Sequence, residues 1–178
     1  MDVVEAWEKY GPWDFFGAHP VCKYLTNSGV GWLARKEETP SHKWSEVDSI
    51  YMNFERYRSM AAGALFFNKM LELVKRTGKG YVENPIMHKY AKQIVLQDYT
   101  QVIQPFMFGH MERKATCLWI EGVEALKQTN NVKAEMDKLP KNVSQRLHFL
   151  PPSADRDELR SKTYQGIADA MAEQWGVM

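Results

Sequence analysis

Residues 59–70, SMAAGALFFNKM, open with ten uncharged residues and reach their first charge at Lys69, in a chain of which 25% of the residues are charged. The small residues at the start leave several faces of a helix without bulk, which lets a second helix approach closely. Phe66, Phe67 and Met70 then follow on more than one side. A helix that is apolar all round is normally enclosed by protein. The stretch therefore predicts a helix covered either by the rest of the chain or by another protein.

The apolar pattern extends this stretch into one long helix, expected from about Ser45 to Arg76. Ser45 followed by Asp48 is typical of a helix start, and Gly78 after two cations is typical of a helix end. Between them, apolar residues recur at steps of three and four residues. Such a helix would be roughly 45 to 50 Å long, whereas a compact domain of this chain length is about 40 Å across. The helix is expected to cross the domain or to protrude from it.

Two more long helices are expected after this one. The first opens at Asn84 and Pro85 and ends near Pro105, since proline suits the first helical position and interrupts a helix interior. The second runs from about residue 108 to 127. Shorter helices are expected near Met136 and from Ser153 to the C-terminus. The alternation typical of strands is not evident, so the sequence predicts an all-α fold with three long helices and two or three short ones.

The N-terminal segment, residues 1–43, reads as an irregular aromatic-rich arm ahead of a helical domain at 44–178. It holds much of the glycine and proline of the chain. An arm of this kind has few ways to bury its own aromatic side chains, so we expect them to pack on the rest of the chain or on a partner. The candidate interface residues are Trp7, Trp13, Phe15, Phe16 and Trp32 in the arm, and Ser59, Ala62, Gly63, Phe66 and Phe67 in the long helix.

Charge and composition exclude several classes of function. The net charge is +1 and the acidic and basic residues are interleaved, whereas a nucleic-acid binder gathers its cations on one face. No window reaches the roughly 20 apolar residues of a spanning helix, so we expect no transmembrane span. The N-terminus has neither a secretory nor an organelle leader pattern. Cys22 and Cys117 lie in unrelated segments, which favours a reducing compartment. A single disulfide between them is the alternative.

No catalytic, cofactor-binding or metal-ligating motif stands out among the residues. A helical di-iron site needs Glu-x-x-His pairs, and no glutamate has a histidine three residues later. His110 and Glu112 point to different sides of a helix. His19 and Cys22 are close in sequence, but a catalytic dyad is made by the fold. The glycines near residues 29 and 78 lack a phosphate-binding context. We therefore expect no catalytic residue, no cofactor and no metal.

Three short segments resemble pieces of a known family. ENPIM, preceded by FFNKMLEL, and the later VKAEMDKLPKN resemble the small matrix-side helical subunit of the mitochondrial cytochrome bc1 complex. That family has an aromatic-Lys-Leu segment, an acidic helix start and an Arg-Leu-Pro turn. Here Lys138 stands in place of the arginine, and the arginine-rich helix after the turn is missing. The resemblance implies a mitochondrial accessory subunit that is peripheral to a membrane complex.

These observations lead to a first hypothesis and an alternative. The first is a non-catalytic helical subunit, accessory or structural, of a larger multiprotein complex. That complex would be a respiratory-chain or ATP synthase complex of the mitochondrion, and the partners would be its other protein subunits. The alternative is a helical enzyme or small-ligand-binding protein with a pocket between helices near His88, His110 or Tyr99. The absence of a leader pattern makes the cytoplasm the alternative location.

Overall fold

The computed structural model of the chain describes residues 1–35, 44–47 and 50–176. The chain divides into two compact units, one made of Met1–Thr100 with Cys117–Gly122, the other of Gln101–Thr116 with Val123–Met178. Both helices and strands are present. The prediction of an all-α fold is therefore wrong, and the chain is a mixed α/β protein.

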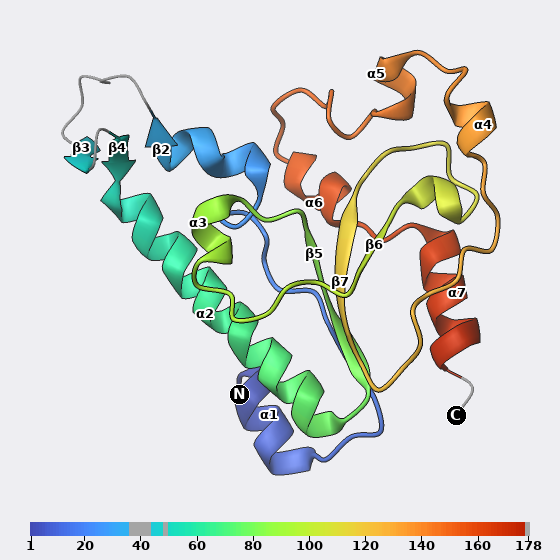
Figure 1. The fold of residues 1–178 in the computed structure, drawn as a ribbon, viewed down its shortest axis with the longest axis horizontal. Coiled ribbons are helices and arrows are strands. Elements are labelled where there is room, and N and C mark those ends of the chain that lie inside the picture. Colours follow the sequence, from blue (N-terminus) through green and yellow to red (C-terminus); the bar gives the residue numbers. More distant parts are fainter. Residues whose placement is uncertain (36–43, 48–49, 177–178) are drawn as a thin grey trace. The chain divides into compact units, whose positions relative to one another are not determined.

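Unit 1 is built on a sheet in which β1 (Phe16–Ala18), β5 (Gly80–Pro85) and β7 (Thr116–Glu121) lie in the order β1-β5-β7. β1 and β5 are parallel, with Phe16 opposite Gly80 and Ala18 opposite Val82. Parallel neighbours need a long crossover connection. Helix α2 (Phe54–Thr77) supplies it and packs against both strands (Figure 1).

Gly80 has a structural reason to be glycine at the start of β5. Its φ of +150° is a conformation that L side chains rarely adopt, and a Cβ there would lie 2.0 Å from the carbonyl oxygen of Phe16. Only glycine, which lacks a Cβ, allows the two parallel strands to approach at this point.

Helix α2 ends where the sequence predicted and starts later. Gly78, in the left-handed conformation, donates its N–H to the carbonyl of Val74, and this confirms the predicted end. The predicted start near Ser45 is wrong. Asn53 caps the helix by accepting the N–H of Arg56 at 3.0 Å.

The residues before Asn53 form a small antiparallel sheet instead of the first turns of the helix. β3 (Trp44–Val47) and β4 (Ile50–Asn53) pair with each other, and β2 (Ala34–Arg35) pairs with the other edge of β4. Ile50 and Tyr51 are β-branched and aromatic, the residue types that strands favour. The predicted long helix thus loses its first two turns to the sheet.

The two other predicted long helices are wrong in the same way. The segment from Pro85 to Pro105 contains the end of β5, one turn of helix in α3 (Lys89–Lys92) and strand β6 (Gln101–Ile103). The segment 108–127 contains β7, with buried residues from Thr116 to Trp119. A short run of buried apolar residues has no period of its own, so helix and strand are hard to separate in it.

The described residues of the predicted arm lie in unit 1. They form α1 (Val3–Tyr10), β1, the 3₁₀ helix η1 (Asn27–Trp32) and β2. α1 starts with Asp2 and Glu5 in a capping box. The segment therefore contributes one strand to each of the two sheets of the unit.

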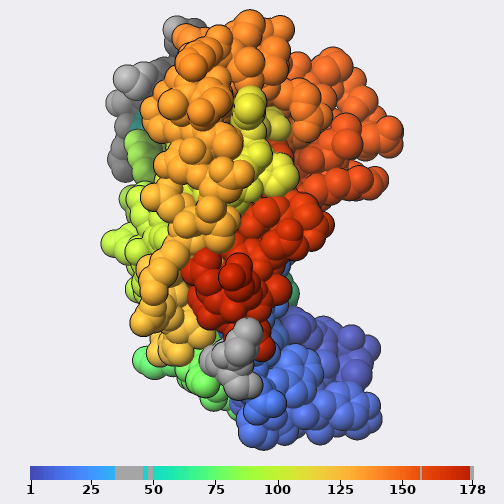
Figure 2. Space-filling view, turned by 90° about the vertical axis from the view of Figure 1, so that its right-hand side faces the viewer, coloured from blue at the N-terminus to red at the C-terminus, as the bar shows by residue number. Residues whose placement is uncertain are grey.

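Unit 2 consists of short elements joined by extended segments. They are β6, η2 (Pro105–Met107), α4 (Lys133–Met136), α5 (Lys141–Ser144), α6 (Arg156–Ser161) and α7 (Gln165–Trp175). The short helix expected at Met136 is confirmed. The single helix expected from Ser153 to the C-terminus is instead two helices, α6 and α7, separated by residues 162–164. In the space-filling view, red α7 lies beside the orange segment that follows Val123 (Figure 2).

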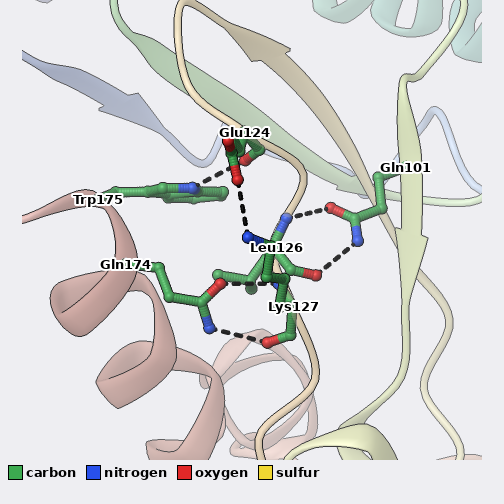
Figure 3. A network of polar contacts seen from close by, with 6 residues as sticks. All are labelled: Gln101, Glu124, Leu126, Lys127, Gln174 and Trp175. Atoms are coloured by element: carbon green, nitrogen blue, oxygen red, sulfur yellow. Dashed lines mark hydrogen bonds and ion pairs between the residues drawn. The ribbon is translucent and has the colours of Figure 1, made fainter.

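The extended segment 124–127 is held by side chains (Figure 3). The amide of Gln101 accepts the N–H of Leu126 at 2.9 Å and donates to its carbonyl at 2.8 Å. Gln174 binds both backbone groups of Lys127 in the same way, each at 2.8 Å. Backbone groups that lack a strand partner are thereby paired, and α7 is tied to this segment.

No helix within residues 1–35, 44–47 and 50–176 is long and apolar enough to cross a membrane.

Candidate functional site

Helix α2 carries large apolar side chains on its outer side. Phe54 is 46% exposed, Tyr57 37%, Leu65 59% and Phe66 42%, and Ala62 is exposed among them. Burying one side chain of this size is worth about 1.5 to 3 kcal/mol. We refer to these five residues as the α2 face.

The opposite side of α2 holds the helix firmly in unit 1. Met60, Ala64 and Phe67 are fully buried. The ring of Phe67 meets the ring of Trp119 edge-on, with 4.7 Å between their centroids. The exposed apolar residues therefore stand on a helix that is already ordered by its own core contacts.

Charged residues lie along the α2 face at regular spacing. Arg58, Leu65 and Glu72 are seven residues apart, which places them on one side of a helix. Lys69 lies between the last two, and all four are exposed. Among the described residues, the recorded ion pairs involve neither Arg58 nor Glu72. The polar edge of the face thus has charges available for a partner.

The other candidate residues of α2 are used within the chain. A Cβ added to Gly63 would meet Leu25 of the same chain at 3.6 Å, so Leu25 occupies the notch that the small residues form. Ser59 is half-buried and donates its hydroxyl to the carbonyl of Glu55 at 3.3 Å. Of the predicted helix residues, the structure leaves Ala62 and Phe66 on the surface.

The aromatic residues of the N-terminal segment are divided between core and surface. Trp7 is buried and donates its indole N–H to Thr77 at 3.0 Å, and Phe16 is buried in β1. Phe15 is half-buried beside Tyr81, with 6.1 Å between the ring centroids. The two exposed indoles are Trp13, which is 37% exposed and stacks on Phe16, and Trp32, which is 61% exposed.

His19 forms a polar cluster with two residues of β5. Its Nδ1 lies 2.7 Å from a carboxylate oxygen of Glu83, and its Nε2 lies 2.9 Å from the hydroxyl of Tyr81. Burial raises the pKa of Tyr81, and the negative charge of Glu83 raises it further. A carboxylate that orients a histidine is part of many catalytic sites. Here both ring nitrogens are occupied within the cluster, so the arrangement ties β5 to the segment that follows β1.

Glu112 is a buried carboxylate of unit 2. It accepts the hydroxyl of Tyr164 at 2.5 Å and the N–H of Leu147 at 2.7 Å, and Arg146 lies 3.5 Å away. Burial, followed by the contact with Glu112, raises the pKa of Tyr164. Both carboxylate oxygens are in use. The group therefore joins distant segments of the unit and offers no free base.

Of the residues expected to line an interhelical pocket, His88 and Tyr99 belong to unit 1 and His110 to unit 2. His88 is buried, donates Nε2–H to the carbonyl of Tyr24 at 2.9 Å and accepts the N–H of Ala91 at Nδ1. His110 lies in unit 2 and accepts the N–H of Gly166 at 3.0 Å. Tyr99 lines a cavity of about 10 Å³ beside Trp119. That volume is about the space that one water molecule requires.

The described residues offer little for metal binding or thiol chemistry. Within the part of the chain that the structure describes, no three His, Cys, Asp or Glu side chains are grouped as metal ligands. Cys22 and Cys117 both remain thiols, which answers the question of a bridge between them. Burial raises the pKa of Cys117 to about 11, so that thiol is a poor nucleophile at neutral pH.

A scan against protein-family models gave no match, and no curated protein or solved structure matches the chain. The geometry of the described residues therefore carries the functional argument.

Sequence reasoning missed most of the α2 face. Phe54, Tyr57 and Leu65 fit the period of the predicted helix, but none of them was among the candidate interface residues. Arg58 and Glu72 lie on the same side of the helix as Leu65, and their charges are the signal that could have marked this side as the outer one. A side that carries both charges and large apolar residues is typical of a contact surface more than of a core.

Proposed function

We propose that the chain is a non-catalytic structural subunit that binds another protein chain through the α2 face. The observation that carries this proposal is the exposure of Phe54, Tyr57, Leu65 and Phe66 along a single helix. Phe54 and Leu65 lie on nearly the same side of the helix, with Tyr57 and Phe66 on its two flanks. Single exposed apolar residues are normal, whereas larger apolar groups rimmed by charge mark interaction sites.

The rigidity of α2 supports the same role. The helix is capped at both ends, by Asn53 and Gly78, and its inner side is buried against unit 1. A surface that is ordered before binding loses little conformational entropy when a partner arrives. Aromatic residues such as Phe54 and Phe66 are also among the types enriched in interface centres.

The finer expectations remain predictions. Membership of a respiratory-chain or ATP synthase complex, and a place in the mitochondrion, depend on the sequence resemblance. That family is helical, and the mixed α/β fold gives the resemblance no added weight. The cavity beside Tyr99 has room for about one water molecule, so it does not favour the alternative, a ligand-binding or catalytic protein.

Comparative co-purification tests the proposal. The tagged chain is isolated from its own cells as the natural protein, as Leu65→Glu and as Leu96→Glu. Leu96 is 86% exposed and lies outside the α2 face, so it is a matched control. We expect Leu65→Glu to lose the bound protein chain and Leu96→Glu to retain it. Equal recovery of all bound chains by both variants would overturn the proposal.

A further inference from the structure

We propose that the partner at the α2 face is a second copy of this chain, bound with its α2 antiparallel to the first about a twofold axis at Leu65. The inference rests on the proposed function, because it names the partner of the same surface. A twofold contact uses one patch on both copies, so residue i meets residue j and j meets i. The patch must therefore be complementary to itself.

The charges of α2 meet this condition in the antiparallel arrangement. When Leu65 faces Leu65 of the second copy, the residue seven positions before it faces the residue seven positions after it. Arg58 then faces Glu72 of the second copy, and Glu72 faces its Arg58. Glu55 and Lys75, each ten positions from Leu65, lie on opposite flanks of the helix and therefore add no facing pair in this register. Opposite charges at facing positions favour one register over its alternatives.

A parallel arrangement lacks this match. It would place Arg58 against Arg58, Lys69 against Lys69 and Glu72 against Glu72. Like charges that face each other across an interface cost free energy and suppress that pairing. The pattern thus selects the direction of the second helix as well as its register.

The apolar residues fall where such an interface needs them. Leu65 lies on the axis, and Ala61, Ala62 and Phe66 lie within about one turn of it. Lys69, also one turn from Leu65, faces Ala61 of the second copy, so the centre is mainly apolar and the Arg58–Glu72 pairs lie toward the ends. This distribution is the usual one of a hydrophobic core and a polar rim. The two alanines also leave room for a close approach of the helix axes.

The length of the helix sets the strength to expect. The 24 residues of α2 span about 36 Å. One helix pair of that length covers less than the roughly 800 Å² per partner of a standard stable interface. The dimer is therefore expected to be concentration-dependent rather than permanent.

Analytical ultracentrifugation of charge variants tests the inference. The measured samples are the full chain, Arg58→Glu, Glu72→Arg, the double variant, and an equimolar mixture of the two single variants. In either single variant both facing pairs become like-charged, so the dimer dissociation constant should rise at least about tenfold.

The mixture and the double variant restore the opposite charges. In a dimer of the two single variants, the new glutamate at position 58 of one faces the new arginine at position 72 of the other. The unchanged Glu72 of the first variant likewise faces the unchanged Arg58 of the second. Dimers should therefore form between the two variants, and the double variant should form dimers with itself.

The outcomes separate this inference from the proposed function. Dimers of the unmodified chain that are lost in both single variants and restored in the mixture would support it. A monomeric natural chain at all concentrations would overturn it, and so would single variants that dimerise as well as the natural chain. If the chain is monomeric while Leu65→Glu still loses a different protein in the co-purification, the proposed function stands and the self-pairing fails. Far-ultraviolet circular dichroism confirms that each variant is folded.

Discussion

The hydroxyl of Tyr164 donates to the buried carboxylate of Glu112 at 2.5 Å, across 52 residues of sequence. The same carboxylate accepts the N–H of Leu147. Three segments of unit 2 therefore meet at one charge. Because a hydrogen bond to an ionised group contributes more than a neutral one, this contact is a main link between the segment before β7 and α7.

Tyr164→Phe removes the hydroxyl and leaves the ring. We expect the free energy of unfolding to fall by about 1.5 to 3 kcal/mol, the usual range for a hydrogen bond to a charged group. Urea unfolding followed by fluorescence measures it. Tyr10→Phe is the control, since Tyr10 is 56% exposed, and it should change stability by less than about 0.5 kcal/mol. Equal effects of the two variants would contradict the role assigned to the Tyr164 hydroxyl.

The same tyrosine predicts a loss of stability in alkali. The pKa of Tyr164 is raised in the folded protein, first by burial and then by Glu112. The unfolded chain therefore loses this proton first, and the stability falls as pH rises above about 10, the ordinary tyrosine pKa. Tyr81 has a pKa shift of the same sign and adds to the effect. Stability curves between about pH 8 and 11 should be less steep for Tyr164→Phe than for the natural chain.

His88 predicts a loss of stability in acid. Burial lowers the pKa of His88, and the positive charge of Arg56 acts in the same direction. The unfolded chain then binds a proton that the folded chain resists, so stability falls as pH drops below about 6.5, the ordinary histidine pKa.

His88→Asn tests that assignment, because asparagine retains a cap for the N–H of Ala91 and does not titrate. We expect lower stability near neutral pH, by roughly 1 to 2 kcal/mol for the lost Tyr24 hydrogen bond and packing, and a weaker dependence on pH between about 5 and 7. An unchanged pH dependence would show that His88 does not contribute to it.

Gly63 in α2 predicts opposite outcomes for two substitutions. Its added Cβ would meet Leu25 at 3.6 Å, an ordinary contact distance. Gly63→Ala should therefore stabilise the protein by about 0.5 to 1 kcal/mol, the difference between glycine and alanine in a helix interior. Gly63→Leu should destabilise it by about 1 to 3 kcal/mol through overpacking against Leu25. Thermal unfolding of both variants measures the sign, and destabilisation by alanine would contradict the geometry.

Gln174 predicts a local effect on backbone exchange. Its side chain binds the N–H and the carbonyl of Lys127, each at 2.8 Å. Gln174→Ala exposes both groups, so the amide of Lys127 should exchange with solvent much faster. The amide of Leu126, which Gln101 binds, is the internal control and should keep its protection. Equal acceleration at both amides would indicate that the whole segment has unfolded.

Part of the fold could be predicted from local chemistry. Gly78 ends α2 because a left-handed cap after Lys75 and Arg76 is a local feature, and Met136 lies in a short helix as expected. The strands could not be recovered in the same way. Val82 in β5 and Trp119 in β7 lie in strands whose sheet neighbours are distant in sequence, and such tertiary contacts override local propensity.

The candidate site shows the same limit. The small residues around Gly63 indicate a close contact, and the structure supplies one through Leu25. Sequence periodicity predicts that α2 is a helix with many apolar residues. It does not predict which of those residues face outward. Phe67 and Leu65 are two residues apart and both apolar, yet Phe67 is fully buried and Leu65 is 59% exposed. Only the placement of β1 and β5 against one side of the helix separates them.

Thiol reactivity at position 65 tests the central claim most directly. Leu65→Cys and Leu96→Cys are purified under native conditions, and the rate of maleimide labelling at each new thiol is compared between concentrated and dilute protein, with Cys22 and Cys117 as the common background. The account predicts that the thiol at 65 is protected in the concentrated assembly and labelled on dilution, whereas the thiol at 96 is labelled equally in both. Equal labelling of position 65 at all concentrations would contradict the claim that the α2 face is covered by a second copy of this chain.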